Sequence, residues 1–214
     1  MKLYGYFRSS ASYRARIALN LKGLDYEYIS INVHEGGVDK PEYAHGVNPQ
    51  KLVPALEANG LVIAQSLAIC AYLDEIKPEP PLMPRDAAGR ARVRGLALFI
   101  ACDIHPLNNT RVLDYLTNRL QVSEEQRLAW YHHWINVGFV ALEESLSRCA
   151  ATGKFCHGDE PTLADVCLVP QVYNAYRYKV DMTPYPTLRR INETCLARPA
   201  FDKARPEKQP DAVP

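Results

Sequence analysis

A charged side chain and two hydroxyls stand where a strand gives way to a helix near the N-terminus of this 214-residue chain. The residues are Arg8, Ser9 and Ser10. A helix N-terminus concentrates N–H donors and partial positive charge, so a hydroxyl beside it can hold an anion or a thiolate. The same hydroxyl can also simply cap the helix. Because the stretch contains no cysteine, any sulfur chemistry here requires a thiol from a bound molecule.

Other residues of the same half could hold a small ligand. A cis bond between Val53 and Pro54 would leave the Val53 backbone to pair with a peptide-like ligand, although the sequence does not fix the isomer. Gln65 and Ser66 open a predicted helix, where they can bind a carboxylate or act only as a cap. Arg8 offers a bidentate fork for a carboxylate, or is a solvated arginine at a strand end.

The period of the apolar residues predicts the elements that position these groups. We expect a strand over 3–7, a helix that ends before Gly23 and a parallel strand over 26–31, which together form a βαβ unit. A hairpin around Asn59-Gly60 and a helix capped by Ser66 follow. This order matches a thioredoxin-like half.

The second half of the chain carries a different period. Four prolines between Ile76 and Arg85 end the first pattern. Beyond them, apolar residues recur at helical spacing over 90–103, 123–148, 162–178 and 185–197. We expect the polar tail over 203–214 to be irregular. Thr162 and Asp165 resemble a capping box, so we interpret Asp165 as structural. We predict a domain over 1–80, a linker over 81–89 and an all-α domain over 90–214.

Composition restricts the partners. The chain has 25 basic and 24 acidic residues, so no strong field favours nucleic acid or an anionic membrane. No apolar run approaches the roughly 20 residues of a membrane helix, and the N-terminus lacks a signal peptide, so we expect a soluble, cytoplasmic protein. The six cysteines form no C-x-x-C pair, and His132-His133 point to different faces of a predicted helix. We therefore predict no metal.

Motifs recur along nearly the whole chain. Those in the first half are 6–10 with 14–19, 48–49 with 53–54, and 65–69. Those in the second half are 103–109, 158–160 with 164–165, 168–172, 179–186 and 209–211. Together they resemble the motifs of the zeta-class glutathione transferases, a family that includes maleylacetoacetate and maleylpyruvate isomerases. One position departs from the family pattern, because Ala11 stands where the family usually has cysteine.

The resemblance implies an α+β two-domain glutathione transferase fold that forms a homodimer. In that fold a thioredoxin-like N-terminal domain binds glutathione, and an all-α C-terminal domain forms the acceptor-substrate site. Carried over by motif, the glutathione contacts would be Ser9 and Ser10 at the sulfur, Val53 at the backbone, Gln65 and Ser66 at the γ-glutamyl carboxylate, and His105 and Asn109 near the dimer interface. Arg177 would hold a substrate carboxylate, with Arg8 and Arg111 as companions. The alternative role for these arginines, and for Arg111 in particular, is a salt bridge at the surface or at an interface.

The implied activity is glutathione-dependent cis–trans isomerisation of a maleyl-type diketo diacid. The expected conversion is maleylacetoacetate to fumarylacetoacetate, in aromatic amino acid catabolism. Three alternatives stay open: a maleylpyruvate isomerase, a general glutathione transferase acting on small α-halo acids, and a non-catalytic glutathione-binding module. The motifs do not decide whether Ser9 or Ser10 is the thiolate partner.

Overall fold

The computed structural model describes residues 1–213 and groups the chain into two compact units. The first unit contains Met1–Leu82 together with the segment from Ala197 onward, and the second contains Met83–Leu196. The sequence analysis assigned that C-terminal segment to the helical domain, so the structure differs from this assignment. The physical reason is α9 (Pro199–Lys203), which packs on α1 (Ser10–Leu21) and buries Phe201 completely.

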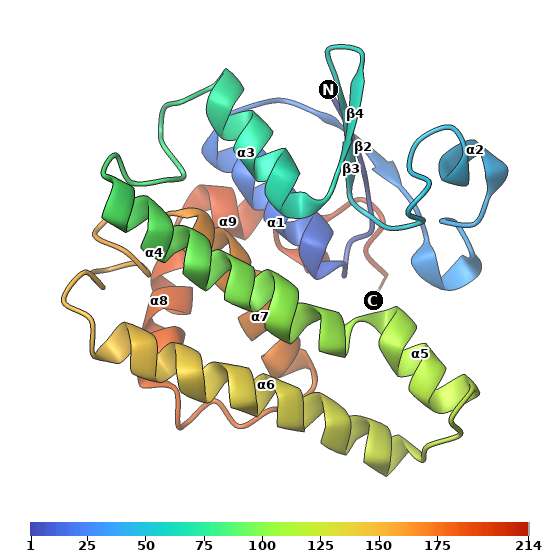
Figure 1. The fold of residues 1–214 in the computed structure, drawn as a ribbon. Coiled ribbons are helices and arrows are strands. Elements are labelled where there is room, and N and C mark those ends of the chain that lie inside the picture. The colour runs from blue at the N-terminus through green and yellow to red at the C-terminus, as the bar shows by residue number, and fades with distance from the viewer. Residues whose placement is uncertain (214) are drawn as a thin grey trace. The chain divides into compact units, whose positions relative to one another are not determined.

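A mixed four-stranded sheet organises the first unit (Figure 1). Its spatial order is β2 (Glu27–Ser30), β1 (Lys2–Gly5), β3 (Ala55–Ala58) and β4 (Leu61–Ala64). β1 pairs parallel with β2 and antiparallel with β3, where Leu3 lies opposite Leu56. The parallel pair joined by α1 is the predicted βαβ unit. Asn59 and Gly60 have φ angles of 52° and 78°, the positive values that the predicted hairpin turn requires.

Two helices provide most of the apolar packing in this unit. α3 (Ser66–Ile76) runs beside α1 and also contacts β3 and β4 (Figure 1). Ile17 and Leu19 on α1, and Ile69 and Leu73 on α3, are fully buried. Burial of such side chains is the main favourable term in folding. The apolar contacts between α1 and α3 therefore hold the two helices together and position their N-termini relative to each other. The loop between β2 and β3 also contains α2 (Pro41–Ala44), which is too short to show a period.

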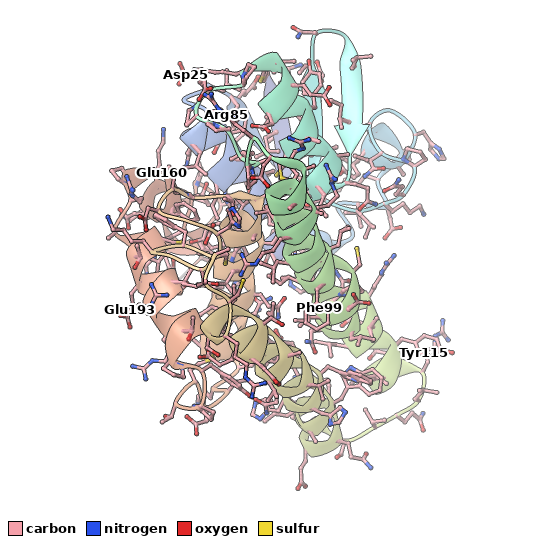
Figure 2. The ribbon with its side chains drawn as sticks, turned by 60° about the vertical axis from the view of Figure 1, so that its left-hand side comes forward. Asp25, Arg85, Phe99, Tyr115, Glu160 and Glu193 are labelled. Atoms are coloured by element: carbon pink, nitrogen blue, oxygen red, sulfur yellow. The ribbon has the colours of Figure 1, made fainter. Side chains whose placement is uncertain are left out.

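The second unit is helical, as predicted, and Met83–Leu196 contains no strand among the residues described. Its helices are α4 (Ala87–Leu98), α5 (Thr110–Asn118), α6 (Glu124–Ser147), α7 (Leu163–Arg177) and α8 (Pro186–Leu196), and α7 packs against α4 and α8. A π-helical segment (Phe99–Ile104) and a 3₁₀ turn (His105–Asn108) connect α4 to α5. The sequence analysis missed α5, from which Tyr115 projects outward at 58% exposure (Figure 2).

Asp165 has the structural role that its position predicted. Its carboxylate is fully buried, and it accepts hydrogen bonds from the backbone N–H groups of Cys156 and Thr162, both at 2.8 Å, and from the Thr162 hydroxyl. Burial raises the pKa of Asp165, while these donors oppose the rise. The carboxylate thus joins the start of α7 to the loop before it.

Candidate functional site

Ser9 is the cap of α1, and Ser10 is the first residue of the helix. The Ser9 backbone is extended, with φ −66° and ψ 118°, and its Oγ accepts the N–H of Ser12 at 3.2 Å. Ser9 is half-buried, whereas Ser10 is only 6% exposed. A capping oxygen uses one lone pair, so the hydroxyl hydrogen of Ser9 remains able to donate to a ligand. Capping and ligand binding are therefore compatible in this one residue.

Val53 follows a loop that other side chains hold in place. Tyr43 Oη and Asn48 Nδ2 both donate to the carbonyl oxygen of Leu52, at 2.6 and 2.7 Å. Burial raises the pKa of Tyr43 to about 12, so the phenol keeps its proton and donates. The Val53-Pro54 bond is cis. Within residues 1–213 no backbone group bonds the N–H or C=O of Val53, so both remain for an extended ligand.

The N-terminus of α3 differs from the prediction in one respect. The cap is Gln65 rather than Ser66, and Gln65 makes no capping bond with its own side chain. Its φ of 73° is strained for a residue other than glycine, and its amide nitrogen donates to Gln50 Oε1 at 2.7 Å. Such strain costs about 1–3 kcal/mol and is concentrated at ligand sites. Ser66 becomes the first helical residue and is 6% exposed.

Arg14 connects the starts of the two helices. It lies one turn after Ser10 on α1, and its Nη1 stands 3.5 Å from Ser66 Oγ on α3. The side chain is only 2% exposed, yet Nε and Nη2 have no hydrogen-bond partner among the residues described. A buried guanidinium without partners is costly, so its donors fit an anionic ligand group beside the α3 N-terminus. A carboxylate is one group of this kind, because it accepts two parallel hydrogen bonds from a guanidinium.

The sequence analysis gave Arg14 no role of its own. The available signal was its spacing of four residues from Ser10, which places both on one face of a helix. That spacing does not reveal that α3 packs beside α1, so Ser66 could not be identified as its neighbour. In the first unit the structure therefore brings together the α1 and α3 N-termini that carry Ser9, Ser10 and Ser66.

The remaining candidate residues lie in the second unit. His105 opens the 3₁₀ turn, and Asn109 caps α5 through Oδ1, which accepts the Arg111 N–H at 3.1 Å. Arg111 is exposed in the first turn of α5. Arg177 is the last residue of α7 and is also exposed, with its guanidinium 5.0 Å from the Tyr178 ring centroid. Capping accounts for the position of Asn109, and both arginines are accessible to an anion.

Arg8 lies between β1 and α1, beside the hydroxyls. It is half-buried, and its guanidinium carbon lies 4.7 Å from the Phe7 ring centroid. This cation–π contact restricts the side chain while its donors stay available. Among residues 1–213 there is no cluster of three His, Cys, Asp or Glu side chains suited to a metal ion, and no helix long and apolar enough to cross a membrane.

Two family models match the chain. The first 75 residues match the glutathione S-transferase N-terminal domain, and residues 135–199 match the glutathione S-transferase C-terminal domain. A probable maleylacetoacetate isomerase of Vibrio cholerae is 52% identical over 211 residues, which cover 98% of this chain and 97% of that protein. A maleylpyruvate isomerase of a Ralstonia species is 47% identical over the full length of both chains. The chain therefore belongs to the glutathione S-transferase family.

Solved structures indicate which class of glutathione S-transferases this chain resembles. The holo structure of a maleyl pyruvate isomerase, described as a bacterial zeta-class glutathione S-transferase, matches with a TM-score of 0.97 and 46% identity over 100% of both chains. A maleylacetoacetate isomerase of Methylobacterium extorquens AM1, with bound malonate and glutathione, matches with a TM-score of 0.96 and 40% identity over 100% of both. The similarity is thus to the zeta class, which confirms the resemblance and the fold class inferred from the motifs.

A third solved structure contains a glutathione conjugate. It is a maleylacetoacetate isomerase of Anaeromyxobacter dehalogenans 2CP-1 with dicarboxyethyl glutathione and citrate bound in the active site. It matches with a TM-score of 0.87 and 42% identity, over 100% of this chain and 97% of that one. Dicarboxyethyl glutathione carries its sulfur on a four-carbon diacid skeleton.

Proposed function

We propose that this protein catalyses the glutathione-dependent cis–trans isomerisation of a maleyl-type diketo diacid, maleylacetoacetate to fumarylacetoacetate. Relatives of this name match nearly the whole chain at about half identity. Bound glutathione supplies a thiolate that adds reversibly to the cis double bond, so that the carbon chain can rotate before elimination. The dicarboxyethyl glutathione found in a relative has the skeleton expected of addition to a four-carbon diacid.

The observation that carries the proposal is the geometry of Ser9. Its oxygen accepts the Ser12 N–H, which fixes the hydroxyl at the α1 N-terminus while its hydrogen stays available. A free thiol has a pKa of about 8.5, and a hydrogen bond to the thiolate together with a helix N-terminus lowers that value. We assign the thiolate contact to Ser9 and a supporting position in the first turn to the more buried Ser10. This arrangement needs no cysteine at position 11.

The rest of the glutathione site follows from the first unit. The unpaired backbone groups of Val53 suit the peptide-like centre of glutathione. Gln65, Ser66 and the orphan donors of Arg14 suit the γ-glutamyl carboxylate. His105 and Asn109 of the second unit are proposed as further glutathione contacts.

Arginines are proposed for the diacid. A maleyl-type substrate brings two carboxylates and develops further negative charge when a nucleophile adds to it. Arg8, Arg111 and Arg177 are accessible cations that can hold a carboxylate or stabilise that charge. Arg177→Ala should therefore reduce turnover of the diacid much more than it weakens glutathione binding.

Maleylpyruvate is the second candidate substrate. The supporting observation is the close structural match to a maleyl pyruvate isomerase and the 47% identity to the Ralstonia enzyme. The two substrates differ only beyond the shared maleyl diketone. Specificity constants measured for both would rank them.

A stopped-flow ultraviolet assay of enzymatically generated maleylacetoacetate and maleylpyruvate tests the proposal. Wild type should convert one or both only with glutathione. Ser9→Ala should lower kcat by about a hundredfold, as loss of one preorganised donor does elsewhere, whereas Ser10→Ala should have a smaller effect. Glutathione binding with no conversion of either diacid would instead support a transferase acting on α-halo acids or a non-catalytic module.

We also propose a cytoplasmic homodimer that acts in aromatic amino acid catabolism. Leu61 and Val62 of the edge strand β4 are 55% and 46% exposed, which supports self-association. Light scattering after gel filtration measures the mass, and a monomer at micromolar concentration would contradict the dimer.

A further inference from the structure

The peptide group of Phe7 is held at both ends by side chains. Its N–H donates to Asp211 Oδ2 at 3.1 Å, and its C=O accepts from Arg16 Nη2 at 2.9 Å. Phe7 lies beyond the end of β1 at Gly5 and two residues before Ser9. The backbone that leads into Ser9 is therefore fixed by contacts that do not belong to the sheet.

Arg16 ties this loop to the C-terminal segment. Its side chain is fully buried, and Nε donates to the Ala204 carbonyl oxygen at 3.0 Å. Burial lowers the pKa of Arg16, but the guanidinium stays charged and donates to carbonyl groups on both sides. The residue that follows α9 is thus linked through Arg16 to Phe7.

Asp211 is held by more than one donor. Besides the Phe7 N–H, its Oδ2 accepts from Ser30 Oγ at 2.9 Å and from Tyr28 Oη at 3.3 Å. Burial raises the pKa of Tyr28, which keeps that phenol a donor. Through hydrogen bonds to this one oxygen, the C-terminal segment that carries Asp211 is linked to β2 and to the β1–α1 loop.

The C-terminal segment is built to keep Asp211 in place. Phe201 and Ala204 are fully buried. Gln209 Nε2 donates to the carbonyl oxygens of Lys203 and Arg205, at 3.0 and 2.7 Å. These contacts order the segment, which we call the C-terminal brace. The proposed function assigns no role to its 209–211 motif.

We propose that Asp211 is a positioning residue, which acts with Arg16 through the Phe7 peptide group to hold the Ser9 hydroxyl where it meets the glutathione sulfur. The link continues from Phe7 to its neighbour Tyr6, whose carbonyl oxygen accepts the Ser9 N–H at 3.0 Å. A displacement of about 1 Å can cost a hundredfold in rate, so a brace behind the hydroxyl affects function. This inference rests on the proposed function.

Three variants test the brace. Asp211→Ala removes the acceptor. Asp211→Asn removes the negative charge but keeps an acceptor, because the amide oxygen can replace Oδ2. Asp202→Ala is the matched control, since this carboxylate of the same segment forms ion pairs with Lys208 and Arg205, whose side chains are exposed at the surface.

The first readout is amide hydrogen exchange of the ligand-free protein. Asp211→Ala should raise exchange of the Phe7 and Ser9 amides by about tenfold or more, while Asp211→Asn and Asp202→Ala stay within about threefold of wild type. Unchanged exchange in Asp211→Ala would overturn the proposal. So would an Asn variant as exposed to exchange as the Ala variant. This readout is independent of glutathione chemistry.

The second readout is the pKa of enzyme-bound glutathione thiol, followed by thiolate absorbance near 240 nm. In Asp211→Ala this pKa should rise and kcat should fall about tenfold, with the glutathione Kd changed less than threefold. A variant that only lowers the melting temperature, with the thiol pKa at the wild-type value, would refute the positioning role. If wild type binds no glutathione while the exchange result holds, the proposed function fails and the brace remains.

Discussion

Replacing Arg14 with methionine should weaken glutathione binding while stabilising the ligand-free protein. Arg14 is 2% exposed, its Nε and Nη2 have no hydrogen-bond partner among the residues described, and its Nη1 hydrogen bond to Ser66 Oγ is 3.5 Å long. A buried charge left in this state costs free energy in the absence of a ligand. Methionine has a similar length and no charge, so it fills the space without that cost.

The sizes of both effects follow from the structure. A hydrogen bond to a charged group contributes about 1.5–3 kcal/mol, so loss of the Arg14 contact should weaken glutathione binding by roughly 10- to 150-fold. Replacing a poorly paired buried ion by an apolar side chain gains about 1–4 kcal/mol when the packing is good. For a chain of 214 residues each kcal/mol raises the melting temperature by about 2–4 °C.

Titration calorimetry with two ligands isolates the charge. One ligand is glutathione, and the other is an analogue whose γ-glutamyl α-carboxylate is converted to an amide. Wild type should prefer glutathione strongly, whereas Arg14→Met should bind both with similar Kd. Thermal unfolding without ligand gives the stability, and Arg94→Met, at an exposed position on α4, is the control that should change neither quantity.

Two results would refute the reasoning. If Arg14→Met binds glutathione as tightly as wild type, the orphan donors do not contact the ligand. If binding of both ligands falls by one common factor, Arg14 supports the fold rather than recognising the carboxylate. A lower melting temperature would additionally show that the guanidinium has partners in solution.

Three further predictions concern strain, pH and a buried carboxylate. Gln65→Gly should raise the free energy of unfolding by about 1 kcal/mol, because glycine adopts the φ of 73° without strain, yet it should weaken glutathione binding. Asn59→Gly, at a φ of 52° in the hairpin, is the control that should leave glutathione binding unchanged. Calorimetry measures the binding of both variants and thermal unfolding measures their stability. The hydrogen bond that the Tyr4 hydroxyl donates to Glu57 lowers the pKa of Glu57. The contribution of Glu57 to stability is therefore present above about pH 4.5 and is lost as the pH falls through its folded-state pKa. The difference in urea unfolding between wild type and Glu57→Gln should vanish at low pH, and a constant difference would contradict this. Asp165→Ala should lower the free energy of urea unfolding by about 3 kcal/mol, because the buried N–H groups of Cys156 and Thr162 lose their acceptor. A loss below about 1 kcal/mol would show that water replaces the carboxylate as the acceptor.

Local structure was predictable where it depends on interactions between residues that are close in the sequence. The positive φ angles of Asn59 and Gly60, the parallel βαβ unit and the hydrogen bonds that Thr162 donates to Asp165 all involve neighbouring residues or a single crossover. The short α2 and α5 were missed, because a four-residue helix has no period and α5 follows directly on a 3₁₀ turn. The cap of α3 was misplaced by one residue, since glutamine is not a preferred cap.

The candidate site was predictable only as a set of residue types. Local sequence chemistry indicated six residues, and family resemblance supplied the rest. The six are Arg8, Ser9, Ser10, Val53, Gln65 and Ser66. Which hydroxyl caps α1 depends on the backbone angles at Ser9, and these depend on how the loop before it is held. The sequence thus could not separate the two serines.

By itself the sequence determined the order of strands and helices, the turn and capping chemistry, and the family motifs, because each depends on residues close together in the chain. Only the tertiary structure decided that Arg14 meets Ser66 across 52 positions and that Phe7 meets Asp211 across 204. These contacts form because apolar burial packs α3 and α9 against α1, which then brings polar groups into hydrogen-bond distance. The polar composition of the C-terminal segment did not indicate these contacts, because the apolar residues that anchor it, Phe201 and Ala204, are few.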